Sequence, residues 1–345
     1  MTKILCVCDA NEPYEVMKRF KALEKWGAEV SFIEDSSLNE IELITDRMLL
    51  LEQQGVDAAP TCKELLENCE DKDILVVHCA SINKEIIDAA KNVKLIAILR
   101  GGTENADKAY LAEKNITLIH SPWRSANAVA DFTVGMMIAE NKNIARSHTA
   151  IKAGNWRKSF VNQSYIHDLR NCRVGLIGLG YIGERVAERL VGFGCEIAIY
   201  DPFFTDEQIR AKGYLPVTEK DLLETSDFVS LHLRLVKETE KYMTKEKFFL
   251  MKNEAYFINT ARSGLMDTNA LIWALEERLI GGAAIDVYDV EPLPEDSPFL
   301  TLDNVTLTSH LAGFSADTVF NSVEICFEDI EKFLQKKPLI NICKN

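Results

Sequence analysis

The sequence lacks the cysteine spacing on which most zinc sites depend. None of its nine cysteines forms a CxxC pair. They are odd in number and scattered along the chain, at Cys6, Cys8, Cys62, Cys69, Cys79, Cys172, Cys195, Cys326 and Cys343. This pattern favours reduced thiols over a disulfide framework. We therefore predict a cytoplasmic protein whose functional site contains no metal.

Long apolar runs and blocks of positive charge are also missing. No apolar run approaches the ~18 residues that a membrane span needs. The first residues, 1–8, form too short an apolar run for a signal peptide and predict a strand instead. The formal net charge is −14 without a long basic block, which disfavours nucleic acid and anionic membranes as partners. The 345 residues, 47% of them hydrophobic, suffice for two domains.

The chain does contain a glycine-rich turn between a strand and a helix. The apolar run Val174–Ile177 precedes Gly178, Gly180 and Gly183, and apolar residues at helical spacing follow. In such a turn the first glycine allows the tight bend and the second lets the backbone approach a pyrophosphate. The third lets helix and strand pack closely. The amino terminus of the helix adds free N–H groups, which suit an anion.

A carboxylate strengthens the prediction of a dinucleotide site, because a lone GxGxxG is weak evidence. A second apolar run, Ile197–Tyr200, is followed by Asp201, 18 residues past Gly183. A carboxylate there can hold a ribose diol and would repel a 2′-phosphate. We therefore predict NAD rather than NADP, with Tyr181 and Ile182 of the turn also contacting the cofactor.

Strands alternate with helices along the whole chain. Predicted strands of the first half are Ile4–Val7, Val30–Ile33, Ile74–His78, Leu95–Leu99 and Ile116–His120, and those of the second half include Phe228–Leu233, Ala255–Asn259, Ala283–Val287 and Val305–Thr308. The alternation predicts an α/β fold with parallel sheets and helices on both faces. Residues 40–70 remain open between helix and strand. One long helix is predicted from Ala126 to about Ile151, and a last one, Thr318–Leu334, is expected to return to the first domain.

Three polar residues follow predicted strands downstream of the glycine turn. They are Arg262, Glu291 and His310. Each alone has an ordinary explanation, as a surface ion pair, a loop residue and a structural histidine. Ligands of open α/β sheets, however, bind at the carboxyl ends of the strands. The position of all three residues after predicted strands therefore predicts an active site.

At these residues the chain resembles the D-isomer-specific 2-hydroxyacid dehydrogenase family. The resemblance extends from about residue 95 to residue 314. It implies two doubly wound parallel-sheet domains, with a Rossmann NAD-binding domain, residues 121–310, inserted into a flavodoxin-like domain. That second, substrate-binding domain comprises residues 1–120 and 311–345. The resemblance also implies a homodimer, to which the long helix from Ala126 contributes.

The resemblance assigns a role to each of the three polar residues. His310 resembles the proton donor to the carbonyl oxygen, Glu291 its carboxylate partner, and Arg262 the group that binds the substrate carboxylate and polarises the carbonyl. A carboxylate beside an imidazole favours the charged ring, and a guanidinium offers two parallel donors to a planar 2-oxo acid. Further residues resemble cofactor-contacting positions of the family, namely His232, Thr260, Ala261 and Asp286.

The segment Arg100-Gly101-Gly102 resembles the loop of the family that binds the substrate carboxylate. Its glycines free backbone N–H groups to point at an anion. Arg100 stands where the family usually has a small residue, and Arg234 replaces a common proline. Two explanations of Arg100 stay open: an ion pair with Glu104 or another acid outside the pocket, or a contact with the distal end of a long substrate.

We predict an NAD-dependent oxidoreductase that interconverts a D-2-hydroxy acid and its 2-oxo acid by hydride transfer. One alternative is a dehydrogenase of the phosphoglycerate or sugar-acid type. The other is an NAD-sensing, corepressor-like binding protein, since some members of the family act in that way. The complete set of Arg262, Glu291 and His310 favours the enzyme.

Overall fold

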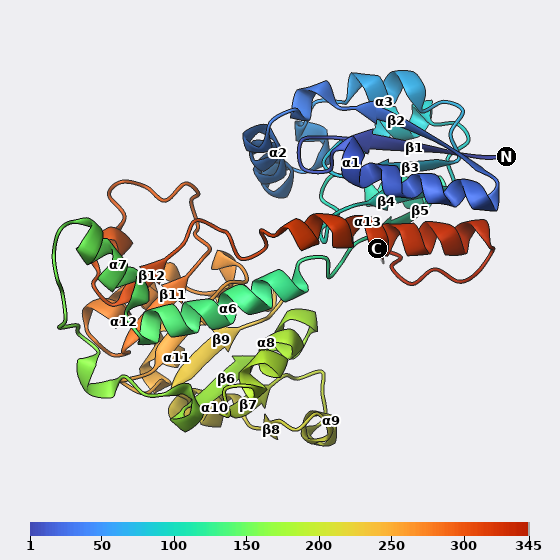
Figure 1. The fold of residues 1–345 in the computed structure, drawn as a ribbon. Helices are drawn as coiled ribbons and strands as arrows, with labels where there is room; N and C mark the ends of the chain where they lie inside the picture. The colour runs from blue at the N-terminus through green and yellow to red at the C-terminus, as the bar shows by residue number, and fades with distance from the viewer. Residues whose placement is uncertain (344–345) are drawn as a thin grey trace. The chain divides into compact units, whose positions relative to one another are not determined.

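The computed structural model describes residues 1–343 and divides the chain into two compact units (Figure 1). Unit 2 comprises Ala126–Phe314, and unit 1 comprises Met1–Ser125 together with the tail that begins at Ser315. The C-terminal helix therefore packs on the N-terminal unit, as predicted. The chain passes between the units after residues 125 and 314, whereas the predicted domain boundaries follow residues 120 and 310.

Unit 1 contains a five-stranded, wholly parallel sheet in the order β2-β1-β3-β4-β5. Its strands are β1 (Thr2–Cys8), β2 (Ala28–Glu34), β3 (Ile74–Val77), β4 (Leu95–Ile98) and β5 (Thr117–His120). This is the flavodoxin-like order, in which the winding reverses beside the first strand. All five strands that the sequence predicts are present.

Helices cover both faces of the unit 1 sheet. They are α1 (Tyr14–Met17), η1 (Lys18–Trp26), η2 (Ser36–Leu38), α2 (Ile41–Gln54), η3 (Val56–Ala58), α3 (Lys63–Asn68), α4 (Lys84–Ala89), α5 (Lys108–Glu113) and α13 (Ala316–Leu334). Alternate residues of β1 point to opposite faces. Ile4 joins the core under η1 and α13, and Leu5 joins the core under α3, α4 and α5. The open segment 40–70 thus contains helices rather than strands.

Unit 2 contains a seven-stranded parallel sheet in the order β12-β11-β10-β9-β6-β7-β8. Its strands are β6 (Arg173–Ile177), β7 (Glu196–Tyr200), β8 (Leu215–Pro216), β9 (Phe228–Leu231), β10 (Tyr256–Asn259), β11 (Gly282–Ile285) and β12 (Val305–Leu307). Both units are therefore doubly wound α/β structures, which confirms the predicted fold class. Apolar cores lie on both faces of this sheet, as a two-sided parallel sheet requires.

The helices of unit 2 correct one prediction. They are α6 (Ala126–Asn141), α7 (Ile144–Lys152), η4 (Gln163–Tyr165), η5 (Leu169–Asn171), α8 (Tyr181–Val191), α9 (Asp206–Ala211), α10 (Glu219–Thr225), α11 (Lys245–Leu250), η6 (Ser263–Leu265), α12 (Thr268–Glu276) and η7 (Pro298–Thr301). The single helix predicted from residue 126 to about 151 is therefore wrong. Asn143 adopts a left-handed backbone with φ of +56°, which ends α6 and which asparagine tolerates better than most residues. Its buried side chain donates a hydrogen bond to Asn162 Oδ1 at 2.7 Å, which holds the break in place.

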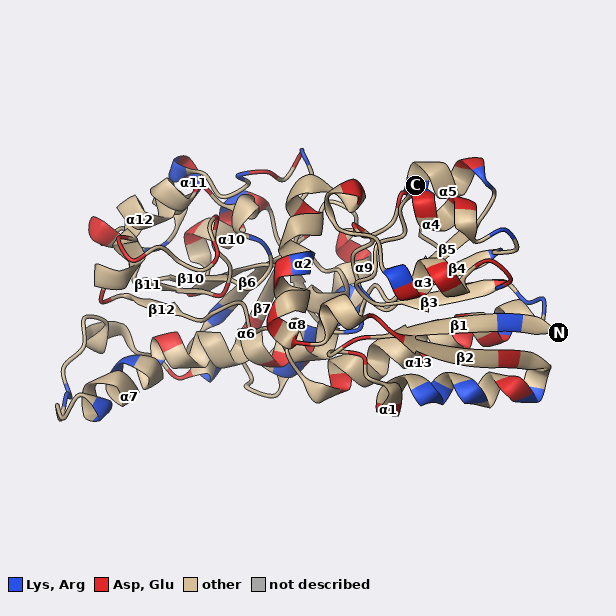
Figure 2. Cartoon of the chain, turned by 90° about the horizontal axis from the view of Figure 1, so that it is seen from above, with Lys and Arg blue, Asp and Glu red and all other residues tan. Residues whose placement is uncertain are grey.

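Acidic and basic residues are interspersed along the helices of both units (Figure 2). Among residues 1–343, no helix combines the length and the apolar composition that crossing a bilayer requires.

Candidate active site

One row of paired residues crosses six strands of the unit 2 sheet. The register aligns Tyr200, Ile177, Leu231, Asn259, Ile285 and Leu307. The residues directly after this row leave the sheet at one edge, in the same order Asp201, Gly178, His232, Thr260, Asp286 and Thr308. All of them except Thr308 are predicted cofactor-binding residues. The fold therefore gathers at one edge residues that lie far apart in the sequence.

The winding of the unit 2 sheet reverses at β6. This strand pairs with β7 on one side and with β9 on the other. The connection after β6 leads to β7, and the connection after β9 leads to β10, so the two run in opposite directions along the sheet. Ligands of open α/β sheets bind at such a switch point. The glycine turn follows β6, and His232 follows β9, so both border it.

The three glycines of the turn meet three different steric conditions. Gly178 has φ of +101°, and a Cβ there would lie 2.7 Å from the carbonyl oxygen of His232. A Cβ on Gly183 would lie 2.2 Å from the oxygen of Gly178, so no larger residue fits between helix and loop. By contrast, a Cβ on Gly180, the residue that caps α8, would have no described atom within 4 Å apart from its own residue and its two chain neighbours. The turn is closed on the protein side and open at Gly180, which fits a pyrophosphate at the start of the helix.

Asp201 is fixed beside this turn. Its Oδ2 accepts a hydrogen bond from the backbone N–H of Leu179 at 2.7 Å, and its Oδ1 accepts one from that of Phe203 at 2.8 Å. Each carboxylate oxygen has a second lone pair that can accept a hydroxyl. The position is therefore compatible with the predicted ribose contact.

His232 and Thr260 occupy the edge on the other side of the switch point. Burial lowers the pKa of His232 to about 4, so its ring is neutral at pH 7, and its Nε2 lies 3.0 Å from Ser230 Oγ. Thr260 is buried, and its hydroxyl lies 2.6 Å from that of Thr133 in α6. The backbone N–H of Ala261 donates to Asn259 Oδ1 at 3.0 Å. The side chains of His232 and Thr260 are thus held by neighbours within unit 2.

Asp286 is fully buried and holds the loop that carries His310. Its Oδ1 accepts hydrogen bonds from the hydroxyl of Thr308 at 2.6 Å and from the N–H of Leu311 at 2.9 Å. Its Oδ2 accepts one from the N–H of Ala312 at 2.9 Å. These three bonds fix the chain before and after His310. The sequence predicts Asp286 only as a cofactor contact and does not anticipate this structural role.

His310 and Glu291 form the pair that the sequence predicts. His310 Nδ1 lies 2.9 Å from Glu291 Oε2, and Glu291 Oε1 accepts the N–H of Tyr288 at 3.0 Å. Because Nδ1 faces the carboxylate, Nε2 is the nitrogen left for a substrate. His310 has φ of +56°, an unfavourable backbone that the bonds of Asp286 offset on either side. Both side chains are partly exposed, at 44% for His310 and 29% for Glu291.

Arg262 lies two residues beyond Thr260 and is exposed. Its Nη1 donates to the carbonyl oxygen of Ala261 at 2.8 Å, and its own carbonyl accepts the side-chain amide of Asn259 at 3.0 Å. Within residues 1–343 its guanidinium forms no ion pair with a carboxylate. The positive charge is therefore available to an anionic ligand.

In unit 1, Arg100 is buried and only loosely paired. Its Nη2 lies 3.7 Å from Glu52 Oε1 and 3.8 Å from Glu104 Oε2, both beyond hydrogen-bonding distance. Its Nη1 is buried, with no hydrogen-bond partner among the described residues. The adjacent backbone is held by His120, whose Nδ1 lies 2.8 Å from the oxygen of Gly101. The structure thus shows the ion pair with Glu104 and, in addition, a buried Nη1 that has no hydrogen-bond partner among the described residues.

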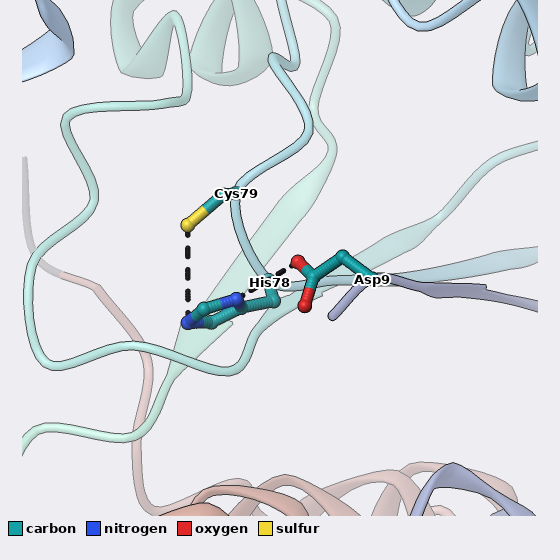
Figure 3. A group of neighbouring side chains, drawn as sticks. All are labelled: Asp9, His78 and Cys79. Atoms are coloured by element: carbon teal, nitrogen blue, oxygen red, sulfur yellow. Dashed lines mark hydrogen bonds and ion pairs between the residues drawn. The ribbon is translucent and has the colours of Figure 1, made fainter. Parts of the chain in front are cut away.

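The sequence reasoning missed a group of ionisable side chains in unit 1. Asp9, Glu12, His78 and Cys79 are all buried, and Arg124 Nη1 lies 3.4 Å from Glu12 Oε1. Burial raises the pKa of Glu12 to about 7. Asp9 directly follows β1, and His78 directly follows β3. In the second half of the chain, polar residues that directly follow strands were used to predict the site. The same criterion, applied to the first half, would have found Asp9 and His78 (Figure 3).

Comparison with known proteins places the chain in a family. The NAD-binding domain of the D-isomer-specific 2-hydroxyacid dehydrogenases matches residues 134–312. A glyoxylate reductase of Thermofilum pendens is 36% identical over 80% of this chain and 83% of its own length. A D-3-phosphoglycerate dehydrogenase of Methanocaldococcus jannaschii is 35% identical over 86% of this chain, but this chain spans only 57% of that protein.

A solved structure supports the same architecture. The D-lactate dehydrogenase of Lactobacillus jensenii, solved with NAD⁺, superposes over the full length of both chains with a TM-score of 0.76 and 24% identity. The chain belongs to the D-isomer-specific 2-hydroxyacid dehydrogenase family. It is an NAD-dependent oxidoreductase that acts on the CH–OH group of a D-2-hydroxy acid, as the sequence predicts.

The glycine turn yields a paired prediction. Gly183→Ala forces the turn to move, so we expect a loss of about 1–3 kcal/mol in the free energy of unfolding and at least about tenfold weaker NADH binding. Gly180→Ala meets no protein atom and should leave the stability unchanged, yet it should also weaken NADH binding. Denaturant unfolding and fluorescence titration measure the two quantities. Unchanged NADH affinity in Gly180→Ala would exclude a close approach of the cofactor to this backbone.

Proposed function

We propose that His310, Glu291 and Arg262 carry out the interconversion of a 2-oxo acid and its D-2-hydroxy acid. NAD supplies or accepts the hydride at the carbonyl carbon. During reduction His310 donates the proton on Nε2 to the carbonyl oxygen, which becomes the hydroxyl, and in oxidation it takes that proton back. Arg262 binds the carboxylate of the substrate with two parallel donors.

The contact of 2.9 Å between His310 Nδ1 and Glu291 Oε2 carries this proposal. It fixes the ring orientation and stabilises the imidazolium that forms when His310 takes a proton. The bonds of Asp286 to Leu311 and Ala312 add a rigid backbone under the ring. A catalytic acid placed in this way needs little reorganisation during the reaction.

For His310→Ala we expect kcat to fall by roughly two to four decades, the usual scale of general acid–base catalysis, while NADH affinity changes little. Arg262→Lys keeps the charge but loses the two-donor geometry, so KM for the oxo acid should rise and kcat should fall. NADH oxidation with a panel of 2-oxo acids measures both. His167→Ala, a change at an exposed histidine of unit 2, is the control. Full turnover in His310→Ala near neutral pH would remove this residue from the mechanism.

We further propose that Asp201 binds the adenine-side ribose and disfavours NADP. Its carboxylate is anchored by two backbone N–H groups, so it cannot move away from a 2′-phosphate without losing them. Asp201→Ala should therefore narrow the preference for NADH over NADPH, measured as the ratio of kcat/KM for the two cofactors. Equal use of both cofactors by the wild-type enzyme would contradict this role.

The loop Arg100–Gly102 is proposed to bind the substrate, with Arg100 recognising a distal anionic group. A buried guanidinium with an unsatisfied Nη1 is costly, and an anionic substituent would supply the missing acceptor. This favours a substrate longer than glyoxylate, in the phosphoglycerate or sugar-acid range. Binding energy from such a remote contact can also orient the reacting group.

Arg100→Ala separates this role from a structural one. For a 2-oxo acid with a distal phosphate, kcat/KM should fall by the equivalent of roughly 2–4 kcal/mol, and for glyoxylate it should change little. Arg210→Ala, which removes an exposed arginine paired with Asp206, is the control. Equal losses for both substrates would assign Arg100 to loop structure.

We also propose that the enzyme is a homodimer that uses α7. This helix has no buried residue, and its Ile144 and Ile151 expose 53% and 51% of their surface. Trp156, in the segment that follows the helix, exposes 78%. Exposed apolar side chains of this density favour an interface. We expect light scattering to give about twice the chain mass of 38.9 kDa, and Ile151→Glu with Trp156→Glu to shift the protein to monomer. A monomeric wild-type protein at micromolar concentration would contradict the proposal.

A further inference from the structure

The loop that follows β9 contains a cation that neither the cofactor site nor the catalytic pair includes. Arg234 lies two residues beyond His232 and is exposed, at a position where the family commonly has a proline. In the part of the chain that the structure describes, no carboxylate pairs with its guanidinium. Its charge is therefore available to an anionic ligand at the carboxyl edge of the unit 2 sheet.

The loop after β9 lies directly against the glycine turn after β6. The backbone N–H of His232 donates to the carbonyl oxygen of Ile177 at 2.8 Å. A Cβ on Gly178 would lie 2.7 Å from the carbonyl oxygen of His232 and 3.3 Å from Leu233 Cδ2. Because the winding of the sheet reverses between β6 and β9, these two loops border the crevice in which a dinucleotide binds.

The backbone of Arg234 is fixed beside this crevice. Thr239 donates its hydroxyl to the carbonyl oxygen of Arg234 at 2.6 Å and accepts the backbone N–H of Val236 at 2.9 Å. Two residues of extended chain span at most about 7 Å, which is also about the length of an arginine side chain. Arg234 is two residues from His232, which contacts the turn, so its guanidinium can reach an anion bound in front of the turn.

The pyrophosphate of NAD needs more positive charge than the turn supplies. The amino terminus of a helix corresponds to about half an elementary charge, whereas the pyrophosphate carries two negative charges. Asp201 adds another negative charge beside the turn, and the net charge of the chain is −14. The arginines of α8 are already paired, Arg185 with Glu188 and Arg189 with Asp131. A cation from a neighbouring loop would complete the charge balance.

The alternative partner of Arg234 is the substrate. The next residue, Leu235, lies against the loop after β10, since a Cβ on Gly264 would lie 2.9 Å from Leu235 Cδ2. That loop, however, contributes Arg262, to which we assign the substrate carboxylate. The substrate therefore has a cation of its own in unit 2, whereas the turn offers the pyrophosphate only backbone groups. The charge balance favours the cofactor as the partner of Arg234.

We propose that Arg234 binds the pyrophosphate of NAD from the side of the crevice opposite the glycine turn. Its guanidinium offers two parallel donors to phosphate oxygens, in addition to the backbone N–H groups at the start of α8. Arg234 thus positions the cofactor and takes no part in the transfer of the proton. The inference rests on the proposed NAD site at the glycine turn and adds to it a contact that a proline cannot make.

Binding of NADH in the absence of substrate tests the contact. In a fluorescence titration, Arg234→Ala should raise the Kd about 10-fold or more, because a hydrogen bond between charged groups is lost. Arg234→Lys keeps the charge but loses the paired donors, so its Kd should lie between those of the wild type and Arg234→Ala. Added salt should raise the Kd of the wild type more steeply than that of Arg234→Ala.

Lys237→Ala is the matched control. Lys237 is an exposed cation of the same loop, within the turn that the hydrogen bond from Thr239 N–H to the oxygen of Val236 closes. Its removal changes the net charge by the same amount as Arg234→Ala, yet it should leave the Kd for NADH unchanged. Competition against NADH locates the contact on the cofactor: Arg234→Ala should weaken the binding of ADP-ribose, which contains the pyrophosphate, but not that of adenosine.

The outcomes separate this inference from the cofactor site on which it rests. An unchanged Kd for NADH in Arg234→Ala, with or without a higher KM for the oxo acid, would overturn the role of Arg234. So would equal losses in Arg234→Ala and Lys237→Ala, which would indicate a general effect of charge, or equal losses for ADP-ribose and adenosine. In all these cases the wild type still binds NADH and the cofactor site stands. A wild-type protein that fails to bind NADH would refute the cofactor site and this inference together.

Discussion

The parallel register of the unit 2 sheet is the constraint on which the site depends. Its pairing aligns Ile177, Leu231, Asn259 and Ile285 in one row, so the residues that come next leave the sheet together. Parallel strands all end at the same edge, and the order of winding places the reversal beside β6. A slip of one residue in any strand would turn its apolar side chains toward the other face and disturb the cores that surround the sheet. The packing that stabilises unit 2 therefore also fixes the positions of the polar groups that we assign to the cofactor.

Asp286 joins this edge to the catalytic pair. Three hydrogen bonds to a buried carboxylate stabilise a loop in which His310 adopts a left-handed backbone. Such a conformation costs free energy by itself and persists where its surroundings determine it. Here it turns a partly exposed imidazole toward Glu291 while the residues on both sides remain anchored. Asp286, which the sequence predicts only as a cofactor contact, thus anchors the backbone on both sides of His310, the proposed acid.

Unit 1 shows how far pattern reading extends. Its five strands could be predicted because buried parallel strands are continuous apolar runs. Helix α2 remained ambiguous, because its short apolar stretch, residues 48–51, shows neither the spacing of a helix nor the alternation of a strand. The break between α6 and α7 could not be predicted, because it depends on a bond between Asn143 and Asn162, which belong to separate segments. Cysteine spacing gave no sign of the cluster around Cys79 for the same reason. Its members come from β1 and β3, and only the sheet makes them neighbours.

The sequence alone determined the alternation of strands and helices, the glycine turn, the carboxylate of Asp201 and the set of Arg262, Glu291 and His310. These features are local: each depends on residue type and on spacing within one segment, which folding does not change. The tertiary structure decided what depends on distant partners. It buried Arg100 with an unsatisfied Nη1, gave Asp286 its backbone donors, and joined Asp9 to His78. Burial and hydrogen-bond satisfaction are properties of the assembled fold, because they depend on which segments meet and on how much water remains between them.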